Sequence, residues 1–504
     1  MKKEIRIISL LLAMLLLLSA ALASCGGEDG GTSTASTSAE ATGAVETEPA
    51  DQLEARKLVD DELGNPDLQG KGFRIATYGQ GNADFTDIEE ATGDVLTDSV
   101  FERNSAIEER FNVEIVSVWD EYEAMNTRIP NTILAGDDAF DLVNHQVVKQ
   151  GGMALQGCFM NLYEIPNIDF SKPWWAPATM TDLTYKNVAF IAVGDFSMSA
   201  LSTTYCVLMN KKIAADYGLP EMYDVVHDGK WTIDYIAGVS KEIYDDVNGN
   251  GIQDDDDLYG YITNSQSNAN TYIWAFDNPV IKNTGDELEV VFHTDKIAAI
   301  TEKLVTLFWS GEGMHTSTQK PTWAPSSRNV HHYNYDMFYT GHTLFANGLI
   351  GHAASDDFRN MEDDYSILPY PKWDEVQENY YTMADGSHTA QSVPMTATDY
   401  EFIGIMTEVM NAETYKQVVP VYYDIVLKVK GARDEESVAM LDAILASRCF
   451  DIGYVYDNWK GASFIMQRLL GAKDTNFESH WASNEKAIMA HYGQVIELFE
   501  SAVK

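Results

Sequence analysis

The clearest pattern of residues that could bind a ligand is DVNGNGIQDDDD, at residues 246–257. Side chains with oxygen atoms fall at positions 1, 3, 5, 9 and 12 of this segment, namely Asp246, Asn248, Asn250, Asp254 and Asp257. Gly251 stands at position 6, where the backbone must turn sharply, and Ile252 at position 7 can offer its carbonyl. Calcium takes six to eight oxygen ligands at this spacing. The sequence therefore predicts a structural calcium site, although Asp257 replaces the usual Glu and Gln253 the usual apolar residue. A solvated acidic loop is the alternative.

Aromatic residues are abundant, with 26 Tyr, 10 Trp and 20 Phe. The flat faces of sugars stack on such rings, and neighbouring Asp, Asn and Gln side chains can bind the hydroxyl groups. Four clusters stand out: Trp174 with Trp175, residues 266–278, Trp323 with Tyr333 and Tyr335, and residues 454–459. A single aromatic residue is more often part of a core. Alternating polar and aromatic residues make 266–278 the cluster that most favours a carbohydrate site.

The chain carries no recognisable enzyme signature. It contains no GxSxG, HExxH, P-loop or GxGxxG motif, and its 11 His residues show no zinc-site spacing. Cys158, Cys206 and Cys449 form no CxxC pair, so buried thiols are expected, with one disulfide as the alternative. We therefore predict that the protein is not an enzyme.

The elements that would position these residues begin with a β-α-β-α-β pattern. Strands are expected at 73–77, 113–118 and 141–143, separated by helices at 96–111 and 122–134. This order is typical of a mostly parallel sheet covered by helices, whose ligands lie at the carboxyl ends of the strands. Residues 78–82 and 144–146 should therefore share one rim. A second α/β region starts near residue 203, and the chain is mostly helical from residue 399.

The N-terminus is typical of a lipoprotein precursor. Residues 1–24 combine an early positive charge with an apolar run at 7–18 that is too short to favour a membrane span. Leu22, Ala23 and Ser24 precede Cys25 as in a bacterial lipobox, which predicts diacylglycerol and palmitate on Cys25. An ordinary signal peptide is the alternative. Residues 25–51 are expected to be a flexible linker, because they are too polar to form a core. These features place the protein on the outer face of the cytoplasmic membrane, on the extracellular or periplasmic side.

The charge of the chain restricts its partners. It carries 34 Lys and Arg against 77 Asp and Glu, a net charge of −43. Nucleic acids and anionic membrane surfaces are unsuitable partners, because both require a basic face. The length predicts two large domains, or three.

Several segments, in their order along the chain, resemble those of a known family. AGDDAFDLV, VLMNKKIAADYGL, GKWTIDYI and SILPYPKWDEVQENYY follow the lipobox and linker. Together they resemble an extracellular solute-binding protein of a bacterial ABC importer, of the sugar type that includes maltose-binding protein. The resemblance implies a two-lobed α/β fold of the type II periplasmic-binding-protein kind, with the ligand in a cleft between lobes joined by hinge crossings. Lobe one would comprise 70–192 and 352–420, and lobe two 193–351 and 421–504.

The resemblance also implies which residues reach the cleft. The predicted ligand-binding residues are Tyr78, Asn82, Asn144, His145, Thr203, Thr204, Asn270, Tyr272, Trp274, His352, Asp356, Asp357, Tyr456 and Trp459. The sequence NHQ at 144–146 has no aromatic or charged pair, and GLIGHAASDD at 348–357 has no Trp. Both departures argue against maltodextrin as the ligand.

The predicted function is capture of a carbohydrate, preferably an oligosaccharide, and its delivery to a transmembrane ABC permease by a monomeric protein. One alternative is the same fold binding a peptide or another solute, or feeding a sensor. A secreted carbohydrate-active enzyme and a surface adhesin or lectin are the remaining alternatives.

Overall fold

The computed structural model describes residues 55–79, 88, 90–317, 332–427 and 435–504. The predicted signal segment, the linker, Cys25 and Asn82 lie outside the described residues. Within the described part, no helix is both long and apolar enough to cross a membrane.

The first sheet contains the predicted β-α-β-α-β unit. Its strands run in the order β12 (Thr389–Ser392), β3 (Leu142–Gln146), β1 (Lys71–Ala76) and β2 (Val113–Val118). Strand β1 is parallel to both β2 and β3, whereas β12 is antiparallel to β3. Helices α3 (Val95–Phe111) and α4 (Tyr122–Leu134) make the two connections, as predicted.

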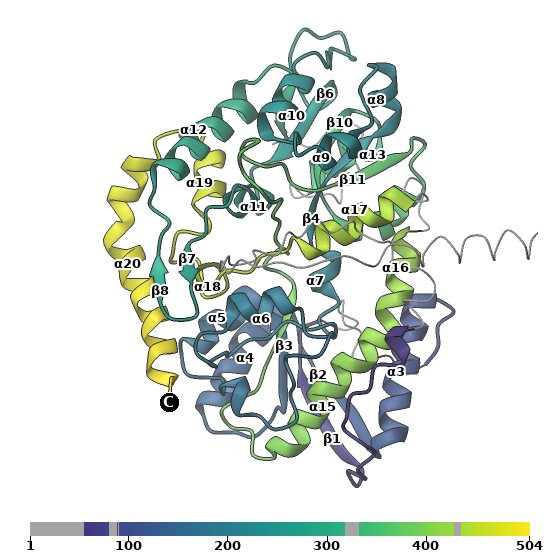
Figure 1. Cartoon of the computed structure of the whole chain (residues 1–504), viewed down its shortest axis with the longest axis vertical. Coiled ribbons are helices and arrows are strands. Elements are labelled where there is room, and N and C mark those ends of the chain that lie inside the picture. Colours follow the sequence, from purple (N-terminus) through teal and green to yellow (C-terminus); the bar gives the residue numbers. More distant parts are fainter. Residues whose placement is uncertain (1–54, 80–87, 89, 318–331, 428–434) are drawn as a thin grey trace, which may run out of the picture. The chain divides into compact units, whose positions relative to one another are not determined.

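Helices cover this sheet because one face of each helix is apolar. Helix α3 begins after Asp94, whose carboxylate accepts the Thr97 N–H at 2.9 Å, and it buries Val100, Ile107 and Phe111. Helices α3 and α15 (Tyr400–Glu413) lie beside β1 and β2, while α5 (Val147–Ala154) packs against β3 and β12 (Figure 1). Because β1 and β3 are parallel, their carboxyl ends lie at one shared rim.

The second sheet is mixed. Its strands run in the order β11 (Tyr365–Leu368), β4 (Tyr205–Asn210), β10 (Thr343–Leu349), β6 (Leu258–Asn264) and β5 (Tyr244–Asp245), and β9 (Met314–Ser317) also pairs with β6. Strand β10 is antiparallel to β4 and parallel to β6. The helices and strands around it are α8 (Lys211–Asp216), α9 (Met222–His227), α10 (Ile233–Ser240), α11 (Asn268–Ala275), β7 (Ile281–Asn283), β8 (Leu288–Val290), α12 (Asp295–Ser310), α13 (Tyr333–Tyr339) and α14 (Asp356–Arg359).

The strand pairing divides the chain differently from the predicted lobe boundary at residue 352. Strand β11 pairs with β4, from Tyr365 opposite Asn210 to Leu368 opposite Val207, so it belongs to the second sheet. The chain re-enters the first sheet only at β12. The return crossing therefore lies between residues 369 and 388, because the pairing of β11 with β4 keeps the chain in the second sheet through Leu368.

Three crossing segments run side by side between the two sheets. One follows α7 (Ser199–Ser202), where Thr204 bridges Ala384 and the Thr203 carbonyl accepts the Asp385 N–H at 2.9 Å. Another follows α17 (Glu435–Ala446), where Arg448 bridges Thr382. Residues 382–388 thus lie between the other two crossings and are tied to both.

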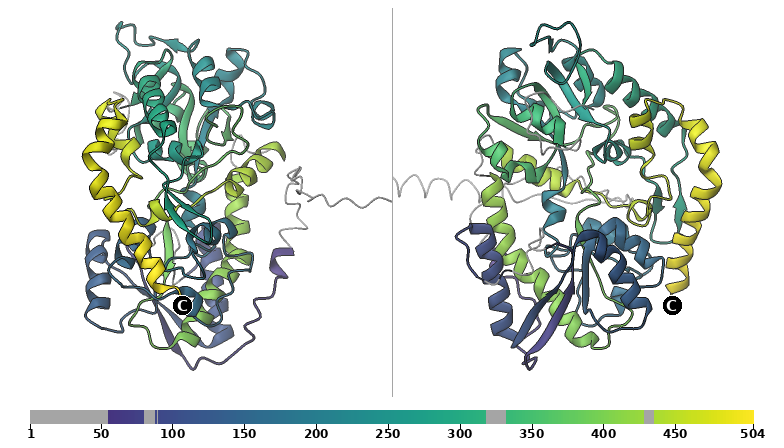
Figure 2. Two further views of the ribbon diagram at one scale, coloured as in Figure 1. Left: turned by 60° about the vertical axis from the view of Figure 1, so that its left-hand side comes forward. Right: turned by 180° about the vertical axis from the view of Figure 1, so that it is seen from behind.

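The C-terminal helix α20 (Phe477–Ala502) runs along α12 and the separate β7–β8 pair and continues to the segment around Phe190 (Figure 2). At its start, Trp481 stacks on His293 with ring centres 4.8 Å apart, beside β8. At its end, Phe499 packs edge-on against Phe190, at 5.6 Å. Phe190 precedes Ala192, which bridges Gln391 of β12. The predicted assignment of all of 421–504 to lobe two is therefore too simple for α20.

Candidate functional site

A cavity of about 230 Å³ opens where the rim of the first sheet meets the crossing segments. Its lining residues come from three places: Tyr122, Gln146, Val148 and Lys149 beside the first sheet; Asp385, Gly386 and Ser387 in the return crossing; and Ser267, Tyr454, Trp459, Phe464 and Gln467 near α11, α18 (Ile452–Val455) and α19 (Ile465–Ala472). Sites of this fold class form at such junctions, at the carboxyl ends of parallel strands.

The wall beside the first sheet is a layer of rings and amides. The Tyr122 hydroxyl donates to Gln146 Oε1 at 2.8 Å, and the Lys149 ammonium lies 6.0 Å from the centre of the Tyr122 ring. Behind them, His145 is buried, with its ring centre 4.9 Å from that of Tyr78 and 5.9 Å from that of Tyr122. Burial and the nearby Lys149 charge lower the pKa of His145 to about 4, so the imidazole is neutral at pH 7.

The opposite wall is aromatic. Trp459 is 51% exposed and stacks on Phe464, with ring centres 3.9 Å apart and planes at 14°. Phe464 in turn packs on Tyr454 at 5.5 Å. Asn458 and Trp459 have φ angles of 46° and 62°, in the left-handed region that bulky residues rarely adopt. Strained backbone is concentrated at functional sites, and here this conformation places an exposed indole at the cavity.

The cavity also presents one carboxylate. The Tyr205 hydroxyl donates to Asp385 and lies 2.8 Å from Ser267 Oγ, while the Ser387 N–H donates to Asp385 Oδ1 at 2.9 Å. Burial alone would raise the pKa of Asp385, but the hydrogen bonds from Ser387, Tyr205 and Ser267 outweigh it and hold this pKa below its ordinary value. The carboxylate is therefore ionised at pH 7 and accepts hydrogen bonds.

A reciprocal amide pair fixes one further polar group. The Gln467 N–H donates to Asn270 Oδ1 at 2.9 Å, and Asn270 Nδ2 donates to Gln467 Oε1 at 3.1 Å. Asn270 is buried, whereas Gln467 lines the cavity. Asn270 therefore orients the side chain of Gln467 toward the site.

This set of groups is suited to binding a neutral polar molecule with flat apolar faces. Trp459 offers a ring for stacking, and Asp385, Gln146 and Gln467 offer acceptors and donors for hydroxyl groups. Glycoside hydrolysis usually needs a pair of carboxyl groups flanking the bond. Asp385 is the only acidic residue that lines the cavity in the described part of the chain.

Five of the predicted ligand-binding residues lie at this cavity or directly behind it. Trp459 lines it, and Asn270 holds Gln467. The Tyr78 hydroxyl donates to the Ser387 carbonyl at 3.4 Å, and His145 packs against Tyr78. Thr203 contributes the carbonyl that accepts the Asp385 N–H.

Four others are buried among structural partners. Tyr272 is 0% exposed, and its hydroxyl lies 2.6 Å from that of Tyr261. Tyr456 is buried against Phe499, Thr204 donates to the Ala200 carbonyl at 2.8 Å, and Asn144 is buried within β3. Every residue of α11 is buried, so the alternation at 266–278 reflects a helix enclosed on all sides. Tyr272, Tyr456, Thr204 and Asn144 are therefore not part of the site.

The residues predicted for the return crossing lie elsewhere, because the crossing comes later in the chain. His352 accepts the Leu349 N–H at 3.2 Å and packs on Tyr335, with ring centres 3.9 Å apart. Asp356 and Asp357 form the first turn of α14, where Asp356 is paired with Arg359 at 3.7 Å.

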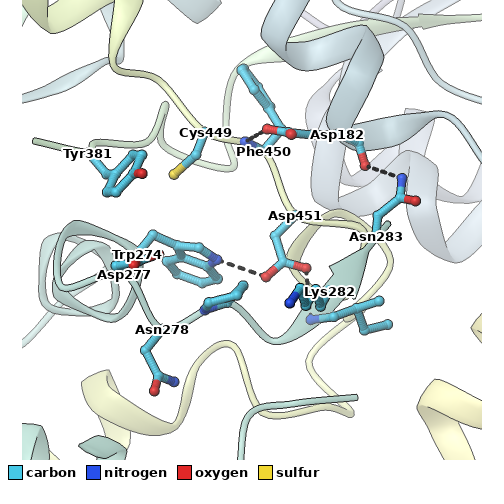
Figure 3. Close-up of a pocket in the computed structure, with 12 residues that line it drawn as sticks. Asp182, Trp274, Asp277, Asn278, Lys282, Asn283, Tyr381, Cys449, Phe450 and Asp451 are labelled. Atoms are coloured by element: carbon cyan, nitrogen blue, oxygen red, sulfur yellow. Dashed lines mark hydrogen bonds between the residues drawn. The ribbon is translucent and has the colours of Figure 1, made fainter. Parts of the chain in front are cut away.

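Trp274 lines a second cavity, of about 210 Å³ (Figure 3). Its indole donates to Asp451 at 2.9 Å, and Asp451 also accepts the N–H groups of Val280 and Gly453, both at 2.6 Å. Asp182 accepts the Phe450 N–H at 2.8 Å, and burial raises the pKa of Asp182 to about 6. The Trp274 ring is only 3% exposed, against 51% for Trp459, so this cavity offers less ring surface on which a ligand could stack.

The cysteines and the tryptophan pair have structural surroundings. Cys158 and Cys206 are buried free thiols, and Cys449 is a partly buried free thiol that donates to the Thr382 carbonyl at 3.2 Å. Trp174 and Trp175 are fully buried, and both indoles donate to Glu408, at 2.9 and 3.0 Å.

The most informative residue that the sequence did not reveal is Asp385. It follows a loop without a motif, and only the bonds between crossing segments bring it to the cavity. Gln146 lies within the predicted rim at 144–146, and Tyr454 within the aromatic cluster at 454–459, so the sequence carried signals for both.

The predicted calcium segment joins β5 to β6, outside both cavities. It contains all the predicted ligands: Asp246, Asn248, Asn250, Ile252, Asp254 and Asp257. Gly251 has a φ of 71°, as the expected turn requires. Burial raises the pKa of Asp257, and so do the charges of Asp254 and Asp246. Within the described residues, no three His, Cys, Asp or Glu side chains are grouped as a metal site.

Comparison with known proteins identifies the fold. No protein-family model matches the sequence, and no curated protein matches it. A cyclo/maltodextrin-binding protein complexed with maltotetraose has a TM-score of 0.53 at 11% identity, covering 87% of this chain and 99% of that one. The ABC substrate-binding protein Lmo0181 from Listeria monocytogenes, in complex with cycloalternan, has a TM-score of 0.51 at 11% identity, covering 84% and 98%. The predicted two-lobed solute-binding-protein fold is confirmed.

Proposed function

We propose that this protein is a lipid-anchored extracellular solute-binding protein that captures a carbohydrate, preferably an oligosaccharide, and delivers it to an ABC permease. The observation that carries the proposal is the cavity at the crossing segments, which combines the exposed Trp459 ring with the ionised Asp385 carboxylate. The two structural neighbours bind maltotetraose and cycloalternan, which supports a sugar ligand.

The position of the cavity suits capture by closure. Its lining residues come from the first sheet, from the crossing and from the segments after α17. A ligand that touches all three groups makes its full set of contacts only when they are close together, so it stabilises the closed arrangement. A permease can then distinguish loaded from empty protein by shape.

A calorimetric screen of the purified protein tests the ligand class. We expect an oligosaccharide to bind at one site without being consumed, and to raise the melting temperature. Ligand at 100 times its Kd stabilises a protein by about 2.7 kcal/mol. Binding of peptides with no response to any sugar would overturn the carbohydrate assignment, and release of shorter sugars would favour an enzyme.

The membrane anchor is a separate part of the proposal, and it rests on the sequence around Cys25. The protein expressed with its own N-terminus should partition into detergent and incorporate labelled palmitate. Cys25→Ser should abolish both while leaving sugar binding unchanged. A wild-type protein that is released into the medium without label would contradict the anchor but not the binding function.

A further inference from the structure

The turn at 246–251 is held by one carboxylate. Asp246 accepts the Asn250 N–H at 3.1 Å and the Gly251 N–H at 2.8 Å, while Asn248 Oδ1 accepts the Asn250 N–H at 2.9 Å. Gly249 and Gly251 have φ angles of 69° and 71°, so the chain can coil tightly around the first three polar side chains.

Further along, polar side chains gather around Asp254. Asn248 Nδ2 lies 3.2 Å from Asp254 Oδ1, and Asn250 Nδ2 lies 2.7 Å from Asp254 Oδ2. Rotation of each amide about its terminal torsion exchanges nitrogen for oxygen without moving the backbone. The same three side chains can therefore direct oxygen atoms toward a shared cation.

An independent observation comes from Asp257, at the base of the loop. Its side chain is 0% exposed, and its Oδ2 accepts the Tyr244 hydroxyl at 3.0 Å and the Asp254 N–H at 3.3 Å. Its other oxygen, Oδ1, is buried and has no hydrogen-bonding partner among the described residues. A buried carboxylate oxygen normally has a partner, because losing its hydration is costly. The bond from the Asp254 N–H to Oδ2 places this carboxylate beside residue 254 of the loop.

Within this segment, the His315 imidazole is paired with Asp255. In the described part of the chain, Asp246, Asp254 and Asp257 form no ion pair with a Lys, Arg or His. All the candidate ligands are oxygen atoms, which hard cations prefer.

We propose that residues 246–257 bind one calcium ion through Asp246, Asn248, Asn250, Asp254, the Ile252 carbonyl and Asp257 Oδ1. The ion has a structural role. The loop closes the antiparallel pair β5–β6, in which Tyr244 is opposite Tyr259 and Asp245 opposite Leu258. Strand β6 also pairs with β10 and β9, so calcium fixes one end of a central strand of the second sheet.

Calorimetry and thermal unfolding of the EDTA-treated protein test this site. CaCl2 should bind with one ion per chain and raise the melting temperature by several degrees, and MgCl2 should have a smaller effect. Asp257→Asn should weaken calcium binding at least tenfold. Asp245→Asn removes the same charge from an exposed position next to the loop and should bind as wild type does.

A further variant protects the test against misfolding. If Asp257→Asn does not fold, Asn250→Ala, at an exposed position, should fold and still lose most of the calcium affinity. Because the loop lines neither cavity, sugar affinity should change less than about twofold in EDTA. Absence of calcium binding in wild type, or equal binding by wild type and the folded variant, would overturn the proposal whatever the sugar result.

Discussion

At the scale of single residues, the proposed sugar site depends most on Trp459, the exposed ring of its lining. The left-handed backbone at Trp459 lowers the free energy of unfolding by on the order of 1–3 kcal/mol. Stacking of its half-exposed ring on Phe464 offsets only part of this loss. We expect Trp459→Gly to relax the backbone and to change the free energy of unfolding by no more than about 1 kcal/mol. Sugar affinity should fall at least about tenfold, or 1.4 kcal/mol.

Two variants complete that measurement by calorimetry. Trp459→Phe keeps a ring at the same place and should retain most of the affinity. Tyr217→Ala removes an exposed aromatic ring from the end of α8, far along the chain from the lining residues, and should leave binding unchanged. If Trp459→Gly instead unfolds the protein, the ring is a core element.

The pH dependence of binding is also decided at this scale. The pKa of Asp385 is held below its ordinary value, and the pKa of His145 is lowered to about 4, so neither group titrates between pH 5 and 8. Sugar affinity should therefore stay constant across this range. At pH values below the ordinary titration range of an aspartate, protonation of Asp385 removes an acceptor and affinity should fall. A tenfold change between pH 5 and 8, measured by calorimetry, would exclude this arrangement.

The sequence located some of these residues and misplaced others for a physical reason. Trp459 belongs to the aromatic cluster at 454–459 and Tyr78 to the predicted rim at 78–82, and both lie at the cavity or beside it. Tyr272 has a similar local sequence but belongs to a helix that is buried on every side. Composition within a short window cannot distinguish a helix enclosed by its neighbours from one that faces a ligand, because the difference lies in segments far away in sequence.

At the scale of elements, α15 is fixed to the segment at 169–175 through a buried carboxylate. Glu408 accepts both Trp174 and Trp175 indole N–H groups, and burial raises the pKa of Glu408 to about 7. The folded protein thus holds a proton that the unfolded chain releases above about pH 4.5. The stability contributed by this proton is complete below pH 4.5 and is lost as the pH rises to 7, by up to about 3 kcal/mol.

Glu408→Gln removes this titration. Its free energy of unfolding in urea should depend less on pH between 5 and 7 than that of wild type. At pH 5 the variant should be the less stable protein, because its amide NH2 group must face one indole N–H. Glu401→Gln, an exposed change on the same helix, should keep the wild-type slope. If Glu408→Gln keeps the wild-type dependence of the free energy of unfolding on pH, groups other than Glu408 cause that dependence.

The elements themselves were largely predictable where the hydrophobic period is regular. The β-α-β-α-β unit of the first sheet follows the predicted order because each strand and helix shows its own period. The pairing of β11 with β4 was not predictable, since it joins residues more than 150 positions apart. The predicted lobe boundary was placed too early for that reason.

At the scale of the whole molecule, the crossing segments and α20 constrain any motion. Residues 382–388 are bonded to both neighbouring crossings. Helix α20 packs through Trp481 on His293 at one end and through Phe499 on Phe190 at the other. We therefore expect ligand release to be accompanied by hinge motion at the crossings, with α20 bending or pivoting beside them.

Ligand binding should then make the protein more compact. Because the lining residues come from the first sheet, from the crossing and from the segments after α17, a sugar that contacts them all favours the closed arrangement. We expect the radius of gyration from small-angle X-ray scattering to fall at saturating sugar. At a sugar concentration near the wild-type Kd, Trp459→Gly should show a much smaller decrease than wild type, because it lacks the ring on which the sugar stacks. If wild type binds sugar with no change in radius, the cavity is already closed without ligand, and a permease would have to recognise the bound sugar or a local feature of the rim.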